Sequence, residues 1–265
     1  MPIAKLKTIS LYYEAYGEGE PLILLHGLGA SGRSWEYQHQ RFTEQFRVIL
    51  VDVRGHGRSD KPPGPYSVPQ LAADIFDLLD HLQIDQFHLL GLSMGGMIGF
   101  QMAVEQPARF YSLTVVNSGP ELVAQNWKER WLIVQRRLVL NFMSMEKIGN
   151  FIGERLFPEP HQAHYKELFV QQMRENDPKA YRAVTNALIG WSVRSQLNRI
   201  QCPVLVISGD MDYTPVANKE AYVREMPTAR LQVIENSRHG TPIDQPDAFN
   251  TAVLQFLHTV QQNRV

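Results

Sequence analysis

Short apolar runs alternate with segments of helical periodicity along most of the 265-residue chain. The runs are rich in Val, Ile and Leu and are bounded by turn residues, which is typical of strands. Because they are continuous rather than alternating, they indicate strands of a parallel sheet that is covered on both faces. The predicted strands are 21–27, 46–52, 87–91, 111–118, 203–209 and 229–235.

Helical segments are predicted between these strands. Segment 68–82 places one apolar stripe on a helix, formed by Leu71, Ile75, Leu78, Leu79 and Leu82. Segment 95–107 is apolar on all sides and ends at a proline, as a buried helix does. Strand and helix in alternation predict an α/β fold with a doubly wound, mostly parallel sheet. The first twenty residues predict an antiparallel hairpin at the edge of that sheet.

The alternation stops between about residues 120 and 192, where no strand-like run occurs. Apolar residues recur there every three or four positions, at Trp127, Trp131, Val134, Leu138 and Phe142. We therefore expect a helical cap at 121–191, inserted after the sixth strand, and a core domain made of 1–120 and 192–265. The aromatic stripe either packs against the core domain or lines a substrate pocket. Trp127, Trp131 and Trp191 are the candidate pocket residues.

Composition and charge favour a small-molecule partner. The chain has 26 Lys and Arg against 27 Asp and Glu, so no overall field recruits nucleic acid or an anionic membrane. Its single cysteine, Cys202, has no internal disulfide partner and is expected to be a packed thiol in a reducing compartment. No signal-like h-region or run of 18 apolar residues is present. We expect a soluble, cytoplasmic monomer or homodimer.

A serine between two glycines is the strongest chemical signal in the chain. Gly91-Leu92-Ser93-Met94-Gly95 follows a predicted strand and opens a predicted helix. In that context the turn strains the serine backbone and exposes its Oγ, while the glycines remove side chains that would collide with the neighbouring elements. The sequence thus predicts Ser93 as a nucleophile. A turn that serves packing alone is the alternative.

A serine nucleophile needs a base and an acidic residue that orients it. His239 lies on a loop just past the last predicted strand and can reach over the sheet edge, whereas His258 falls within a C-terminal helix. The loop after 203–209 offers two acids, Asp210 and Asp212. We favour Asp212, which lies further along the turn, and interpret Asp210 as a solvated or turn-forming carboxylate. These residues occur in the chain in the order Ser, Asp, His, which is the order that an α/β fold with such a serine turn uses.

Backbone donors for an oxyanion are expected from two loops. Met94, the residue after the nucleophile, supplies one N–H group. The loop after the first parallel strand supplies the other, from Leu28 or, as the alternative, Gly29. His26 is expected to brace this loop through hydrogen bonds.

The polar loop at 52–67 offers no metal or phosphate site. His56 has no second ligand at a useful spacing, and the glycine spacing differs from both phosphate-loop patterns. We interpret Arg54 and Ser59 as structural braces of this loop. No metal and no cofactor are expected.

Taken together, these motifs resemble those of the α/β-hydrolase superfamily over essentially the whole chain. The matching stretches are His-Gly-Leu-Gly at 26, Asp-Val-Arg-Gly-His-Gly-Arg-Ser at 52, Gly-Leu-Ser-Met-Gly-Gly at 91, Gly-Asp-Met-Asp at 209 and His239 before Asp-Gln-Pro-Asp-Ala-Phe. The resemblance implies a cofactor-free Ser-Asp-His hydrolase with a helical cap beside its substrate pocket. A serine at 93 separates it from epoxide hydrolases and haloalkane dehalogenases, which use aspartate there.

Within the superfamily, 54–82 and 91–103 resemble the branch of 3-oxoadipate enol-lactonases and small-molecule carboxylesterases. Enol-lactonases of that branch carry a charged stretch near the end of the cap, where this chain has Ile189, Gly190 and Trp191. The departure favours an apolar pocket and a carboxylic ester over a dicarboxylate lactone.

Other functions remain open on the same residues. Lactone hydrolysis, carbon–carbon bond cleavage and perhydrolysis use the same triad, and a ligand-binding receptor is the remote alternative. An anionic substrate needs a cation facing Ser93, for which the candidates are Arg130, Arg137 and Arg194.

Overall fold

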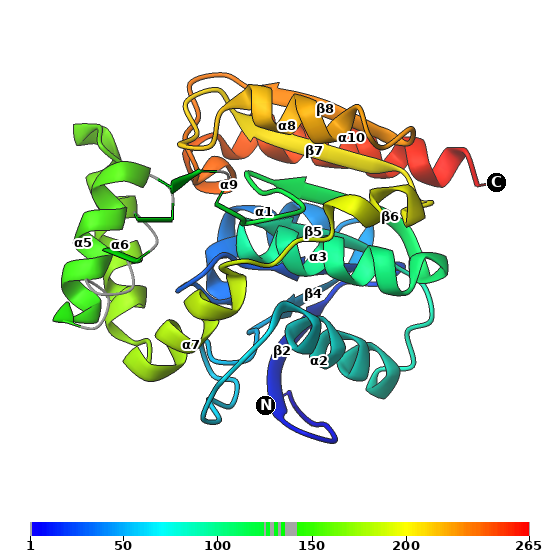
Figure 1. The fold of residues 1–265 in the computed structure, drawn as a ribbon. Coiled ribbons are helices and arrows are strands. Elements are labelled where there is room, and N and C mark those ends of the chain that lie inside the picture. Colours follow the sequence, from blue (N-terminus) through cyan, green and yellow to red (C-terminus); the bar gives the residue numbers. More distant parts are fainter. Residues whose placement is uncertain (1, 125, 128–129, 132–133, 136–141, 265) are drawn as a thin grey trace.

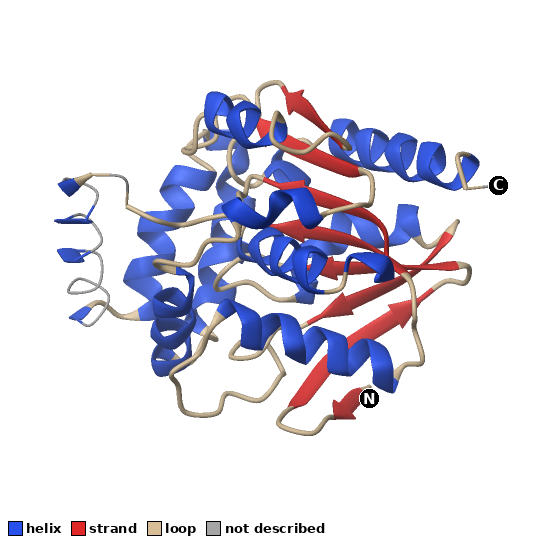
Figure 2. Cartoon of the chain, turned by 45° about the vertical axis from the view of Figure 1, so that its right-hand side comes forward, coloured by secondary structure: helices blue, strands red, loops and turns tan. Residues whose placement is uncertain are grey.

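A twisted central sheet with helices on both faces organises the molecule (Figures 1 and 2). The computed structural model describes residues 2–124, 126–127, 130–131, 134–135 and 142–264. Within these residues the sheet has eight strands, in the order β1-β2-β4-β3-β5-β6-β7-β8. The strands are β1 (Ile3–Lys5), β2 (Ser10–Tyr16), β3 (Glu20–Leu25), β4 (Phe46–Val51), β5 (Phe87–Leu92), β6 (Phe110–Val116), β7 (Val204–Gly209) and β8 (Ala229–Ile234).

The direction of the strands confirms the predicted sheet. Strands β3 to β8 are parallel to their neighbours, whereas β1 pairs antiparallel with β2 and β2 antiparallel with β4. Every residue of β5 and β7 is buried, as continuous apolar runs predict for strands covered on both faces. The N-terminal hairpin lies at the sheet edge as expected.

Helices cover the sheet in two layers with separate apolar clusters. One face packs against α2 (Val68–His81), α3 (Met94–Glu105) and α8 (Val216–Val223) through residues such as Ile75, Phe100 and Tyr222. The other packs against α1 (Glu36–Phe42) and α10 (Pro246–Gln262) through Phe42 and Phe249. Helix α9 (Thr241–Asp244) is a single turn before α10. None of the described helices combines the length and apolar character needed to cross a bilayer.

The segment between β6 and β7 is helical over its described part. It contains α5 (Met145–Leu156), α6 (Ala163–Arg174) and α7 (Pro178–Leu188), which stand beside one end of the sheet (Figure 1). An antiparallel bridge between Glu121 and Ser192 closes its base. The helices pack on one another and on Leu28. Leu138 of the predicted aromatic stripe lies outside the described residues.

Short 3₁₀ turns complete the fold at 32–35, 107–109, 160–162 and 194–199.

The segment between β6 and β7 also contacts the core directly, because the Asn176 amide donates to the carbonyl oxygen of Gly29 at 2.7 Å. The turn between α6 and α7 is therefore hydrogen-bonded to the loop that follows β3.

Candidate active site

Ser93 occupies the turn between β5 and α3 in a strained backbone conformation. Its φ is 52° and its ψ is −111°, a region that residues other than glycine rarely adopt. Two of its backbone hydrogen bonds tie it to the end of β6 and the residues that follow. The Ser93 N–H donates to Val116 O at 2.9 Å, and the Ser118 hydroxyl donates to Ser93 O at 2.6 Å. The strain is thus imposed by the end of β6, the neighbouring strand.

Both glycines beside Ser93 are required by close backbone approach. A Cβ atom added to Gly91 would lie 2.3 Å from the carbonyl oxygen of Gly95, and one added to Gly95 would lie 2.1 Å from the carbonyl oxygen of Leu25. The surrounding atoms are backbone and cannot rotate away. These contacts explain the Gly-x-Ser-x-Gly spacing in physical terms.

Replacing Gly95 with alanine is therefore expected to lower the free energy of unfolding by about 3 kcal/mol or more, because β3 and α3 must move apart. Urea unfolding measures it. Gly119→Ala is the matched control: its added Cβ would meet only Tyr222, at 3.6 Å, and a change of about 0.5 kcal/mol or less is expected. Equal unfolding midpoints for the two variants would contradict this account of the turn.

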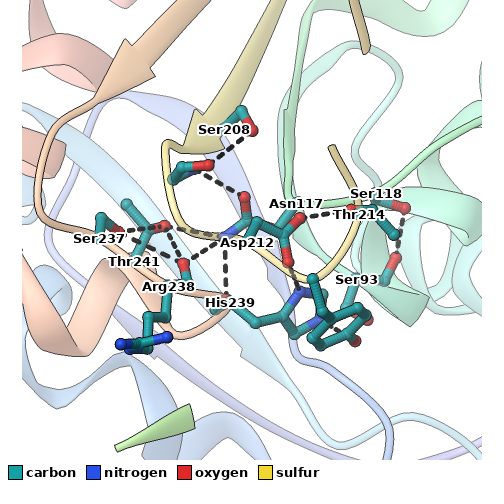
Figure 3. A network of polar contacts seen from close by, with 12 residues as sticks. Ser93, Asn117, Ser118, Ser208, Asp212, Thr214, Ser237, Arg238, His239 and Thr241 are labelled. Atoms are coloured by element: carbon teal, nitrogen blue, oxygen red, sulfur yellow. Dashed lines mark hydrogen bonds and ion pairs between the residues drawn. The ribbon is translucent and has the colours of Figure 1, made fainter. Parts of the chain in front are cut away.

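Asp212 and His239 meet above the sheet edge, on the loops after β7 and β8 (Figure 3). His239 Nδ1 lies 2.8 Å from Asp212 Oδ1, with the carboxylate fully buried and the imidazole 11% exposed. Asp210 instead accepts the backbone N–H of Ser237 at 2.9 Å. Of the two acids in this loop, Asp212 contacts the imidazole and Asp210 holds the turn.

The second carboxylate oxygen of Asp212 contacts a buried cation. Lys219 Nζ lies 2.5 Å from Oδ2, and the Thr214 hydroxyl donates to the same oxygen. Burial alone raises the pKa of Asp212, but the hydrogen bond and charge of His239, followed by the charge of Lys219, outweigh it and lower that pKa to about 2. Asp212 is therefore ionised across the neutral pH range.

Asn117 ties the acid loop and the histidine loop to the end of β6 (Figure 3). Its Nδ2 donates to the carbonyl oxygen of His239 at 2.9 Å and to the Thr241 hydroxyl at 2.8 Å, and its Oδ1 accepts the N–H of Gly209 at 2.9 Å. The residue has a φ of 46°, which asparagine tolerates better than most side chains. One amide thus fixes the separation of the two loops.

The other ring nitrogen of His239 contacts Tyr213. The tyrosine hydroxyl lies 2.7 Å from Nε2, and the two rings stack with centroids 4.1 Å apart. With Nδ1 donating to the carboxylate, Nε2 is the acceptor of this bond. Ser93 and His239 line the same cavity as Tyr213.

The loop after β3 is braced as the sequence predicts. His26 is buried, its Nε2 accepts the N–H of Val53 at 3.1 Å, and its Nδ1–H donates to Gly27 O at 2.8 Å. Burial lowers its pKa to about 4, so the ring is neutral. Leu28 lines the cavity beside Ser93, and Met94 begins α3.

The loop at 52–67 is also held by its own side chains. Arg54 makes a buried ion pair with Asp74, with Nε–Oδ2 at 2.5 Å and Nη2–Oδ1 at 2.7 Å. Ser59 Oγ accepts the N–H of Tyr12 at 2.8 Å. The predicted structural role of Arg54 and Ser59 is confirmed. Among the described residues, no group of three or more His, Cys, Asp or Glu side chains is placed to hold a metal ion.

A cavity of about 1170 Å³ extends from Ser93 and His239 to the inserted helices. The helices contribute a largely apolar wall, formed by Ile152, Leu156, Phe157, Leu168 and Phe169. Strands, helices and loops outside this segment contribute most of the polar groups, and α6 adds Tyr165, Gln171 and Gln172. The space is large enough for a small organic substrate.

The three tryptophans predicted to line this cavity do not do so. Trp191 is buried against α3, where its indole N–H donates to Gln101 at 2.6 Å. Trp127 is 73% exposed and Trp131 is 57% exposed, and neither is among the cavity-lining residues. Helical spacing puts Trp127 and Trp131 on one predicted face, but spacing alone does not say which face turns toward a cavity.

Each Lys or Arg side chain in the described cavity lining is already bound to a carboxylate. The pairs are Arg33–Glu175 at 3.3 Å, Arg194–Glu225 at 2.5 Å and Lys219–Asp212 at 2.5 Å. Arg194 also contacts Glu121 at 3.0 Å. Of the other arginines considered from the sequence, Arg130 is exposed and not part of the lining, and Arg137 lies outside the described residues.

Comparison with known families decides the classification. The family model for the alpha/beta hydrolase fold matches residues 20–246. The chain belongs to the alpha/beta-hydrolase family. This confirms the family and fold expected from the sequence motifs.

Relatives of this hydrolase include lactonases and esterases. 3-Oxoadipate enol-lactonase 2 of Acinetobacter baylyi is 34% identical over 251 residues, which cover 93% of this chain and 92% of that protein. The crystal structure of an enol-lactonase from Burkholderia xenovorans has a TM-score of 0.89 at 26% identity and covers 97% of this chain and 100% of that one. A thermophilic esterase from Thermogutta terrifontis has a TM-score of 0.87 at 27% identity, covering 98% and 99%.

Three polar residues of this hydrolase's site were missed from the sequence. Asn117 follows the apolar run of β6, and a polar residue at a strand's carboxyl end was the available signal. Tyr213 and Lys219 follow Asp212 closely in the chain, but nothing in their spacing says that Tyr213 contacts His239 or that Lys219 folds back onto Asp212.

Proposed function

We propose that this hydrolase cleaves small, neutral carboxylic esters through an acyl-enzyme formed on Ser93. The observation that carries the proposal is one cavity lined by a strained serine and by a histidine that is bound to a buried, ionised aspartate. A nucleophile, a base and an orienting acid are the parts that acyl transfer needs. The triad consists of Ser93, His239 and Asp212.

The reaction begins when Ser93 replaces Tyr213 as the hydrogen-bond donor to His239 Nε2. His239 then takes the Ser93 proton as Oγ attacks the ester carbonyl carbon, and Asp212 stabilises the imidazolium that forms. The N–H groups of Leu28 and Met94 receive the developing oxyanion. His239 next protonates the leaving alcohol, and water hydrolyses the acyl-enzyme by the same route.

A neutral substrate is favoured by the charges around the cavity. A dicarboxylate would need cations, and each described cation of the lining is committed to a carboxylate partner. Helices α5, α6 and α7 act as a cap whose apolar side chains bind the acyl or alcohol portion. Hydrolysis of an enol-lactone is the second candidate, because a relative of that name is 34% identical to this chain.

Two comparisons of substrates test the proposal, one between a neutral and an anionic ester and one between an enol-lactone and the neutral esters. With p-nitrophenyl esters from acetyl to decanoyl, we expect Ser93-dependent turnover, and a kcat/KM for p-nitrophenyl valerate at least tenfold above that for the similarly sized anion p-nitrophenyl hemisuccinate. A tenfold preference corresponds to about 1.4 kcal/mol, a modest cost for bringing an unpaired carboxylate into this cavity. Turnover of 3-oxoadipate enol-lactone orders of magnitude faster than of every neutral ester would instead establish the second candidate.

A further inference from the structure

Lys219 is a buried lysine whose ammonium is fully occupied next to the triad. It lies on α8, and its side chain is 1% exposed. Nζ lies 2.5 Å from Asp212 Oδ2 and 2.5 Å from Thr214 Oγ1, and it also donates to the carbonyl oxygen of Thr214. The three ammonium hydrogens thus have three acceptors.

The two oxygens of the Asp212 carboxylate have different partners. Oδ1 accepts a hydrogen bond from Nδ1 of His239, and Oδ2 accepts hydrogen bonds from Lys219 and from the Thr214 hydroxyl. Contacts on both oxygens fix the rotation of the carboxylate, so that Oδ1 faces the imidazole. Burial lowers the pKa of Lys219, while its hydrogen bond to Asp212 and the charge of that carboxylate act in the opposite direction. The lysine cation on Oδ2 also weakens the attraction between Asp212 and a protonated imidazole and repels that imidazolium.

We propose that Lys219 is a positioning residue that orients Asp212 and limits protonation of His239, so that the base stays available at lower pH than with Asp212 alone. This role rests on the proposed function, because it acts on the base of that reaction. Lys219 borders the cavity, but its ammonium is bound to Asp212 and Thr214, so it acts through Asp212.

The other titratable and charged groups on the loops after β7 and β8, and on the helices that follow them, are the same in every variant. Tyr213 contacts Nε2, and Tyr222 lies on α8. Asp210 and Asp244 accept the backbone N–H groups of Ser237 and Arg238, and the Arg238 side chain pairs with Glu159 of the inserted segment. Burial raises the pKa of Asp244 to about 6, so this carboxyl titrates near that pH in every variant. A difference between variants that all retain Asp244 therefore reports on Lys219.

The test uses the full chain and three variants. Lys219→Met removes the charge and keeps much of the side-chain volume, Lys219→Arg keeps the charge, and Lys7→Met makes the same change at a side chain that is 85% exposed. NMR follows the titration of the His239 ring, and stopped-flow follows the pH dependence of Ser93 phosphonylation by a p-nitrophenyl phosphonate ester. Urea unfolding at pH 7 measures stability in parallel.

We expect Lys219→Met to move the midpoint of the His239 titration, and the acidic limb of phosphonylation, upward by about one pH unit. Lys219→Arg and Lys7→Met should stay near the wild type. A midpoint that is unchanged or lower in Lys219→Met, with reduced stability, would overturn the proposal and leave Lys219 as a pin that holds α8 to the loop. Should Lys219→Met fail to fold, Lys219→Gln gives the same readout.

The role of Lys219 and the role of Ser93 are tested by separate readouts. The NMR midpoint judges Lys219 whether or not the protein cleaves esters. Absence of phosphonylation at Ser93 in the wild type would instead refute the proposed nucleophile.

Discussion

Ser93→Ala is expected to abolish the burst of ester hydrolysis and to lower kcat by about 10⁴- to 10⁶-fold. The loss is large because the methyl group cannot form the acyl-enzyme, and water would have to attack the ester directly. The residual rate of hydrolysis would come from stabilisation of the oxyanion by the N–H groups of Leu28 and Met94 and from substrate binding. Stopped-flow release of p-nitrophenol measures both the burst and the slow phase.

The fold should survive this change. Ser93 is held through its N–H and carbonyl groups, which alanine retains, although the strained φ of 52° is no easier for alanine. Ser192→Ala, at an exposed serine outside the cavity lining, is the control and should match the wild type. A burst of unchanged size in Ser93→Ala would remove Ser93 from the mechanism.

Asp212→Asn is expected to lower kcat by about 10⁴-fold. The amide cannot stabilise the imidazolium, and its NH₂ group facing Nδ1 would favour the wrong tautomer. The change also leaves the buried Lys219 without its counter-charge, so we expect the free energy of unfolding to fall by about 3 kcal/mol or more at pH 7. Asp210→Asn is the matched control in the same loop, with activity expected within a few-fold of wild type. A large loss of activity in Asp210→Asn alone would reverse the assignment of the acid.

The stability difference between wild type and Asp212→Asn should depend on pH in a defined direction. The pKa of Asp212 is lowered from 3.8 to about 2 in the folded protein. A group with a depressed folded pKa contributes stability that is complete above its unfolded pKa, and the contribution is lost as pH falls through the folded value. Urea unfolding of both proteins should therefore show the difference at pH 7 and a shrinking difference between about pH 4 and pH 2.

Much of the fold could be predicted from the sequence because its signals are local. Continuous apolar runs gave the parallel strands, and a stripe that recurs every three or four residues gave α2. The Gly-x-Ser-x-Gly turn is equally local, since the contacts that demand glycine involve β3, β5 and the start of α3.

What the sequence could not give depends on how separate segments face one another. Trp191 turned away from the cavity because Gln101, ninety positions earlier, accepts its indole N–H. Asn117 joins loops whose residues lie up to 124 positions further along the chain. The contact of Tyr213 with Nε2 and that of Lys219 with Oδ2 likewise depend on the path of the acid loop, which residue type and spacing do not encode.

The most direct test of the central claim is to trap the covalent intermediate. Wild-type protein mixed with a p-nitrophenyl ester and quenched in acid within milliseconds should carry one acyl group, located by peptide mass spectrometry on Ser93. Rapid turnover with no acyl adduct, or with the adduct on Cys202 or another side chain, would contradict the proposed acyl-enzyme and the role of Ser93 in it.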